Sequence, residues 1–477
     1  MKKQIKSAVI LCFICLFAMQ ALPETIGLEQ VIREACINSD SVKMMNETVK
    51  KSAQSVREQW AAALPKLSAS ASALENYGSL FSSSSGSSSS SSSHSGSYAT
   101  KDDVKNAIQE TVNGIFSQLS DPQTSTIYST GLSFSQPIYT FGKVGTALKV
   151  AKQYDKAVKC TYQRNMQNIQ LQAFDAFFRA LIAEKTGLIS ERTLARKKEL
   201  NGYLERNFNL GSGSKAQVLS TRADLAGQSA YLLIAKRDAL TAKMTLNMLM
   251  GRSLTDPVTL DTAIGLDGLI DFPIPRIEDA LNFALTQRTD LKSMKLMAES
   301  NNDGAKIYKA MYLPSIAAIG SLGYSKMKSD IAMMDMGWNL SWTAGLAVSW
   351  TLFDGFSNSA KAAQYKSDAN KLEIAYKSIT EMVEIEIRSA LAECCAADSN
   401  SSASQAMLSA AQESYDLTNS NFRQGSGQFA DLQLSDETLR QAELGLINAK
   451  YRLLRSRAAL MVAMGKDIVT FDSQTDK

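Results

Sequence analysis

Two periods of apolar residues alternate along the chain, and they predict long helices separated by short strands. From Leu28 to Ala63 apolar residues recur at helical spacing, which predicts a single helix that Pro65 ends. Residues Lys66 to Tyr77 then alternate between apolar and small polar side chains, which is the pattern of a strand. A second strand is expected over Ile127 to Tyr139.

After the second strand the helical period continues without a break for a long distance. It runs from Phe141-Gly142 to about Asn207, so we expect a helix of roughly sixty-five residues, about 95–100 Å long. Gly211-Ser212-Gly213 interrupts this helix, and a return helix follows to Met250. Stacked end to end, the arriving and returning helices would match the height of the long helix beside them.

The second half of the chain repeats the first. Residues 131–251 align without a gap on 345–465, and the identical positions include Gly211 with Gly425 and Gly213 with Gly427. Such a repeat indicates one structural unit built twice. We therefore predict repeats over residues 22–251 and 276–465, joined by a proline-containing connector over 252–275 and followed by a short tail over 466–477.

The first copy is longer because of an insert between its two strands, over residues 78–126. The insert contains a run of serine and glycine, Phe81 to Ser97, which cannot bury enough apolar area to order itself. A short amphipathic helix is predicted to start near Asp102. Two interpretations stay open, a solvated loop and an extracellular lid or surface contact.

The clearest strand of the second copy is predicted over Trp338 to Phe353. Its apolar face carries three of the four tryptophans in the chain, Trp338, Trp342 and Trp350. A soluble sheet also has an apolar face, but tryptophans near both ends of one face resemble the aromatic girdles of membrane strands. The pattern therefore favours contact with lipid.

The N-terminus and the overall charge limit the location and the partners. Residues 1–21 have the basic start, short apolar run and small final residue of a secretory signal peptide. No later stretch reaches eighteen consecutive apolar residues, so we expect any membrane span to consist of strands. Without its signal the chain is nearly neutral, which argues against nucleic acid as a partner.

Residues that usually carry catalysis or bind metals are sparse. The one histidine, His94, lies in the serine run, and no catalytic set, metal site or cofactor motif can be assembled. We therefore expect no enzyme activity, no cofactor and no metal. The mature cysteines Cys36, Cys160, Cys394 and Cys395 are interpreted as small buried helix residues, although export would permit their oxidation.

Four strands per chain predict an oligomer. They cannot close a barrel, and an open sheet edge in lipid leaves unpaired backbone groups that cost several kcal/mol each. Two chains would give a side-chain-filled barrel of about eight strands, and three would give about twelve strands with a lumen. The small polar residues on the strand face opposite the tryptophans favour the wet, three-chain form.

Together these features resemble the TolC-type outer-membrane efflux family. The segment Ser133–Tyr139 is similar to that family's exit from strand to long helix, and Ser349–Gly355 repeats it. The segments Phe208–Gly211 and Phe422–Gly425, each followed by a small-residue turn, are similar to its two periplasmic tips. The resemblance covers essentially the whole mature chain.

The resemblance implies a mainly helical fold with a membrane β-barrel, assembled as a homotrimer in the outer membrane and extending through the periplasm as an α-barrel. An inner-membrane transporter and a periplasmic adaptor would dock at the tips, for multidrug efflux or for type I protein secretion. The implied tip residues are Phe208, Gly211, Gly213, Phe422, Gly425 and Gly427.

The resemblance also implies an acidic channel entrance just after the second tip. Asp431 falls on the first acidic position of the family, Leu434 on the second, and Gln217 is the counterpart in the first copy. Asp431 could instead serve the helix dipole as a first-turn aspartate.

Two tip residues depart from the family's pattern. Gly427 replaces an arginine and Phe422 replaces a tyrosine found in some members, so we expect packing to hold the tips. A secreted helical scaffold is the alternative function.

Overall fold

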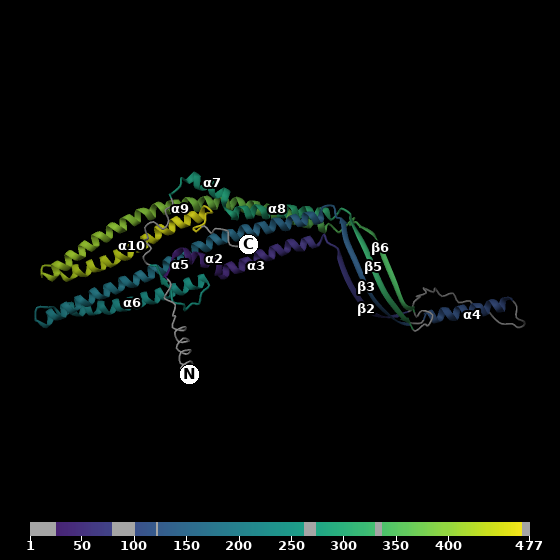
Figure 1. Ribbon diagram of the computed structural model, residues 1–477, viewed down its shortest axis with the longest axis horizontal. Helices are drawn as coiled ribbons and strands as arrows, with labels where there is room; N and C mark the ends of the chain where they lie inside the picture. Colours follow the sequence, from purple (N-terminus) through teal and green to yellow (C-terminus); the bar gives the residue numbers. More distant parts are fainter. Residues whose placement is uncertain (1–24, 79–100, 121–122, 262–272, 330–335, 470–477) are drawn as a thin grey trace, which may run out of the picture. The chain divides into compact units, whose positions relative to one another are not determined.

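The computed structural model describes residues 25–78, 101–120, 123–261, 273–329 and 336–469 (Figure 1). They form two compact units. The sheet unit contains Ser55–Ala151 and Asn302–Lys366, and the helical unit contains the described parts of residues 1–54, Lys152–Asn301 and Ser367–Lys477. The predicted signal peptide, the serine run and most of the tail lie outside the described residues.

The sheet unit contains four antiparallel strands. They are β2 (Lys66–Gly78), β3 (Gln123–Tyr139), β5 (Ser315–Ser329) and β6 (Met336–Ser349), in the spatial order β2-β3-β5-β6 (Figure 1). Helix α4 (Lys101–Ser120) follows the serine run, close to the start predicted for it.

The last predicted strand is shorter than its alternation suggested. β6 ends at Ser349 because that residue pairs with Ser315, the first residue of β5, and no partner remains beyond it. Trp350 therefore lies after the strand, and its indole Nε1 donates to the carbonyl oxygen of Tyr312 at 2.9 Å. The prediction that Trp350 belongs to the strand was wrong, whereas Trp338 and Trp342 lie within β6.

The register separates the sheet into an apolar face and a hydroxyl face. Residues that pair across the strands point to the same side, so the row Ala69, Leu132, Leu322 and Trp342 belongs to the apolar face. On the other side, hydroxyl oxygens lie 2.7 Å apart in the pairs Ser68–Ser133, Ser72–Ser129 and Ser321–Thr343.

The long helices and the return helices of the two halves correspond in length. Helices α5 (Lys143–Asn209) and α9 (Ser357–Arg423) both have 67 residues. Their return helices α6 (Lys215–Met250) and α10 (Phe429–Ala463) have 36 and 35 residues. The long helix and the return helix of the first half therefore lie where the apolar period predicted them.

The single helix predicted from Leu28 to Ala63 was wrong, because the structure has two. Helix α2 (Leu28–Asn38) and helix α3 (Asp40–Ala61) are separated by Ser39, whose ψ of 137° is extended. Arg288 makes the same break between α7 (Ile277–Gln287) and α8 (Thr289–Ala310), with ψ of 123°. Neither break is visible in the apolar period, because a single extended residue that is neither proline nor glycine hardly disturbs the helical spacing.

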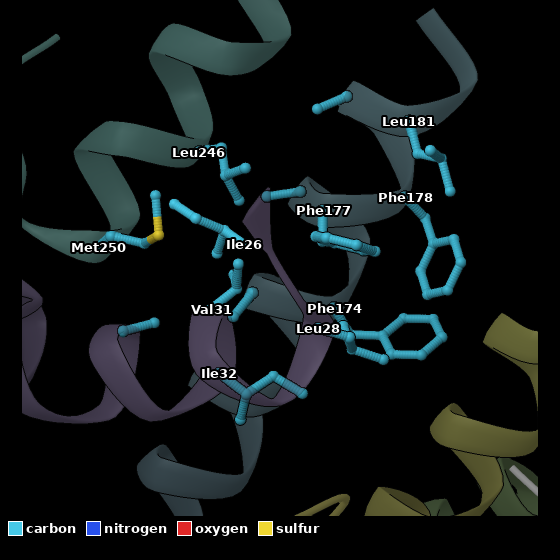
Figure 2. Close-up of a cluster of buried hydrophobic side chains, with 14 of the residues drawn as sticks. Ile26, Leu28, Val31, Ile32, Phe174, Phe177, Phe178, Leu181, Leu246 and Met250 are labelled. Atoms are coloured by element: carbon cyan, nitrogen blue, oxygen red, sulfur yellow. The ribbon is translucent and has the colours of Figure 1, made fainter. Parts of the chain in front are cut away.

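The main core of the helical unit lies where α2, α5 and α6 meet (Figure 2). Phe174, Phe177 and Phe178 of α5 are fully or almost fully buried there, beside Ile32 of α2 and Met250 of α6. Burying a large apolar side chain stabilises a fold by about 1.5–3 kcal/mol. This core fixes the long helix against both shorter ones.

The connector contributes to the same core. Its strand β4 (Thr259–Leu260) pairs in parallel with β1 (Thr25–Ile26), directly before α2. At the end of α6, Gly251 has φ of 70°, and a Cβ there would lie 2.7 Å from the carbonyl oxygen of Asn38. The end of α6 thus lies against the end of α2, next to the break between α2 and α3.

A buried ionic cluster holds the break between α7 and α8. The Arg288 guanidinium, only 5% exposed, donates to Glu386 at 2.6 Å, to Asp290 at 2.7 Å and to the carbonyl oxygen of Ala463 at 3.0 Å. Burial alone would raise the pKa of Asp290, but hydrogen bonds and charge from Arg288, together with the charge of Arg164, lower it. The cluster therefore joins α8, α9 and the end of α10.

The cysteines follow the predicted pattern only in part. Cys36 and Cys394 are buried and Cys160 is half-buried, but Cys395 is exposed, and all four are free thiols. Burial and the charge of Asp467 raise the pKa of Cys36 to about 12. Among the described residues, no helix has the length and apolar character needed to cross a membrane.

Replacing Arg288 should destabilise the helical unit strongly. Arg288→Ala removes the buried guanidinium that Asp290 and Glu386 share and leaves them the longer contacts with Arg164 at 3.7 Å, so we expect a loss of about 3 kcal/mol. Arg388→Ala is the control, because Arg388 contacts Glu384 with both side chains about half exposed, and such a pair contributes no more than about 0.5 kcal/mol. Thermal unfolding followed by circular dichroism measures both, and equal melting temperatures for the two variants would contradict the role of the cluster.

Candidate functional site

The candidate site lies at the two turns that join the long helices to their return helices. We call Leu210–Ser214 the first turn and Gln424–Gln428 the second turn. In the first, the Gly211 amide donates to the carbonyl of Phe208 and the Ser212 amide to that of Asn207, both at 3.0 Å. The second turn makes the same two bonds from Gly425 and Ser426, also at 3.0 Å. These bonds satisfy the last carbonyl groups of the long helices.

The four turn glycines are needed for two different reasons. Gly211 and Gly425 both have φ of 81°, a left-handed conformation that side chains with a Cβ disfavour. Gly213 and Gly427 have no positive φ; a Cβ there would lie 2.6 Å from the amide nitrogen of Phe208 and 2.8 Å from that of Phe422. Only the first glycine of each turn therefore adopts left-handed backbone angles.

The two turns differ in their aromatic contacts. Phe422 lies 6.1 Å from the ring of Tyr203 on α5 and 6.0 Å from that of Phe429, measured between centroids. Phe208, its counterpart in the first turn, leaves 40% of its surface exposed. Packing through Phe422 therefore connects the second turn to the first hairpin, α5 and α6.

Ion pairs also connect the two hairpins near the turns, which the sequence did not predict. Arg423 on α9 contacts Glu199 on α5 at 2.7 Å. Arg196 on α5 donates to Asp436 on α10 at 2.8 Å, and Lys197 lies 3.5 Å from the same carboxylate. Asp436 is buried, so this carboxylate depends on its cationic partners. Packing alone does not hold the turns.

A half-buried tyrosine belongs to the same contact between the hairpins. The Arg196 guanidinium lies 5.5 Å from the ring centroid of Tyr415 on α9. Burial and the nearby charge of Asp436 raise the pKa of Tyr415 above its ordinary value. The phenol therefore stays neutral at physiological pH, and the local charge comes from the arginine, lysine and carboxylate groups.

Asp431 lies in the N-terminal helical turn of α10, after the second turn, and is exposed. The N-cap of this helix is Gln428, which makes no side-chain capping bond. Leu434 lies three residues later on the same side of α10 and is also exposed, at 69%. Gln217, in the corresponding place on α6, is half-buried. Asp431 is thus free to serve both the helix dipole and a ligand or ion outside its own chain.

The chemistry available at the turns is electrostatic and steric. Among the described residues no cluster of three or more histidine, cysteine or carboxylate side chains could bind a metal ion. The aromatic contact and the ion pairs can hold the two helical hairpins together. The exposed Asp431 can present a negative charge beside them.

Comparison with known proteins identifies the family. The sequence profile of the outer membrane efflux proteins matches residues 31–252 and 280–466. The chain belongs to the outer membrane efflux protein family. Among curated relatives, outer membrane protein TolC of Vibrio cholerae is 23% identical over 364 residues, which is 72% of this chain and 78% of the relative. The outer membrane efflux protein BepC of Brucella suis is 22% identical over 366 residues, with 76% and 78% covered.

Solved structures of outer membrane proteins share the fold. VceC of Vibrio cholerae superimposes with a TM-score of 0.69 at 16% identity, covering 93% of this chain and 97% of VceC. The CmeC outer membrane channel of Campylobacter jejuni gives a TM-score of 0.72 at 17% identity, covering 92% and 85%. The predicted fold class, long helices with four strands per chain, is therefore confirmed, and the family is one of outer membrane proteins.

A side chain at Gly425 should loosen the second turn. Gly425→Ala places a Cβ in a left-handed backbone, at a cost of about 1–2 kcal/mol. Amide hydrogen exchange at residues 424–428 should then be about 5–30 times faster. Gly445→Ala is the control, because no atom lies within 4 Å of a Cβ there and alanine favours a helix interior. Unchanged exchange in Gly425→Ala would show that the turn does not depend on this conformation.

Proposed function

We propose that this protein is a homotrimeric channel in the outer membrane, continued by a helical tunnel through the periplasm. The observation that carries the proposal is the sheet, which combines one apolar face with two edge strands. Among the described residues, β2 and β6 each pair with a strand on one side only. In lipid such edges must pair, because no water is available to bond the backbone.

Pairing between copies satisfies both edges with the strand directions that the sheet already has. All neighbours in β2-β3-β5-β6 are antiparallel, so β6 of one protomer can pair antiparallel with β2 of the next. Three protomers supply about twelve strands and leave a lumen, whereas two would fill it with side chains. The hydroxyl face, with Ser68, Ser133 and Thr343, suits a wet interior.

Exposed apolar residues on the helices next to the edge strands support the same assembly. Helix α9 follows β6 along the chain and exposes Ile374, Met382 and Ile385. Helices α2 and α3 precede β2 and expose Ile37, Met44 and Trp60. Each of these side chains is more than half exposed. Contacts between neighbouring protomers would remove this apolar surface from water.

In this proposal the two turns form the periplasmic entrance. An inner-membrane transporter and a periplasmic adaptor dock at these tips. The residues that shape the tips are Phe208, Gly211, Gly213, Phe422, Gly425 and Gly427. Asp431 lines the entrance, and threefold symmetry brings three carboxylates together. The transporter supplies the energy and the cargo, which suits multidrug efflux and type I protein secretion equally. Trp338 and Trp342 face lipid, and Trp350, beyond the strand, lies at the membrane boundary.

A charge on the apolar face should impair assembly in the membrane. Leu346→Arg places a cation toward lipid and should cost about 2–4 kcal/mol if the residue lies near the bilayer midplane. Thr343→Arg is the control, because Thr343 bonds Ser321 on the hydroxyl face. The readout is the amount of trimer in purified outer membranes. Equal tolerance of both arginines would mean that the apolar face does not contact lipid.

Removing the Asp431 charge should change ion conduction. Three carboxylates in a narrow ring attract cations and bind hard divalent or trivalent ions through their oxygens. Asp431→Asn should therefore reduce cation selectivity and cation block together in planar-bilayer recordings, whereas Gln217→Ala should change neither. Unchanged selectivity and block in Asp431→Asn would leave Asp431 as a helix-start residue only.

A further inference from the structure

Two lysines lie on the apolar face of the sheet, where neither the proposed channel nor its tips use them. In the register of β3 and β5, Leu132 pairs with Leu322, Thr130 with Tyr324, Tyr128 with Lys326 and Thr126 with Lys328. Every second residue of a strand shares a face, so Lys326 and Lys328 continue the row of Leu322 and Tyr324. Their side chains therefore emerge on the side that we assign to lipid.

These lysines lie at one end of the sheet. The strands connect to the helices at the opposite end. β2 and β5 begin after α3 and α8, and β3 and β6 end before α5 and α9, so all four helix junctions lie at one end. The other end carries the two hairpin connections, over residues 79–122 and 330–335. In the proposed orientation this second end faces the cell exterior.

The apolar band ends at the level of the lysines. Along β6 it runs from Val348 to Trp338, about 33 Å at about 3.3 Å per residue. Tilted by about 40°, it covers a height of about 25 Å, which equals the apolar band of a membrane barrel. The ring of Trp338 stacks on that of Tyr324 with centroids 4.8 Å apart. Tyr324 precedes Lys326 by two residues and shares its face of the sheet. Aromatic residues at this level indicate the boundary between hydrocarbon and headgroups.

The charge on this part of the face is positive. Neither ammonium group makes a hydrogen bond or ion pair with the residues that the structure describes. Glu75 shares the face, but it lies two strands from Lys328, about 10 Å away at about 4.8 Å per strand. Lysine can extend its apolar stem along the sheet and place its ammonium among headgroups.

We propose that Lys326 and Lys328 bind the phosphate groups of the anionic glycolipid in the outer leaflet, the lipid A part of lipopolysaccharide. This inference rests on the proposed membrane orientation. A lysine ammonium is a compact cation that pairs with phosphate, and the two lysines supply two such cations in adjacent rows of one strand. Threefold symmetry would give three equivalent sites, each beside a tyrosine and a stacked tryptophan that contact the acyl chains.

Native mass spectrometry of the purified trimer with diphosphoryl lipid A tests the site. The double variant Lys326→Gln/Lys328→Gln should bind this lipid roughly tenfold to thirtyfold more weakly than the wild type. Lys66→Gln is the matched control, because Lys66 pairs with Ser135 on the hydroxyl face at the opposite end. Dephosphorylated lipid A should bind the wild type and the double variant equally.

Three outcomes would overturn the proposal. They are undiminished lipid A binding by a trimeric double variant, no preference of the wild type for the phosphorylated lipid, and equal competition by phosphatidylglycerol, which would make the site a general anionic one. The wild-type comparison needs no variant, so it decides the question even where the double variant assembles poorly. Failure of the wild type to form trimers would count instead against the proposed function.

Discussion

The unpaired backbone at the two edges of the sheet is the constraint from which the rest of the account follows. Four strands leave β2 and β6 with one neighbour each among the described residues, and hydrocarbon offers no partner for their free amide and carbonyl groups. An apolar face on such a sheet requires assembly into a closed form. In the proposed assembly the hydroxyl pairs on the other face form the lining, and the helices that continue from the edge strands become neighbours of another protomer.

Internal duplication explains why one constraint shapes so much of the chain. Each half supplies a strand hairpin, a helix of 67 residues and a shorter return helix, and each turn uses the same pair of glycines. The halves differ in the contacts and charges near the turns. Phe422 contacts Tyr203 while Phe208 stays partly exposed, and Asp431 corresponds to the neutral Gln217.

Periodicity predicted the elements well wherever one repeating environment persists. The first long helix and the two faces of the sheet follow from apolar spacing, because burial repeats with the backbone. The glycines predict the turn, and the internal repeat extends both predictions to the second half. Periodicity did not predict helix breaks of a single residue. Ser39 and Arg288 each interrupt a pair of helices without proline or glycine. Periodicity also did not predict the end of β6, because that end depends on where the partner strand β5 begins.

The contacts of the candidate site were predictable only in part. The turn residues share a local motif that the duplication exposes. The pairs Arg196–Asp436 and Arg423–Glu199 join residues 240 and 224 positions apart, and nothing in the spacing of surface charges on helices distinguishes them from solvated ones. The resemblance pointed to an arginine that Gly427 replaces, and the structure places ionic contacts at other positions.

The number of chains in the assembled protein tests the central claim most directly. We expect the mature protein, extracted from outer membranes in mild detergent, to have the mass of three chains by native mass spectrometry, because three copies close both sheet edges around a lumen. A detergent-free, monodisperse monomer, or a stable complex of two chains, would contradict the account.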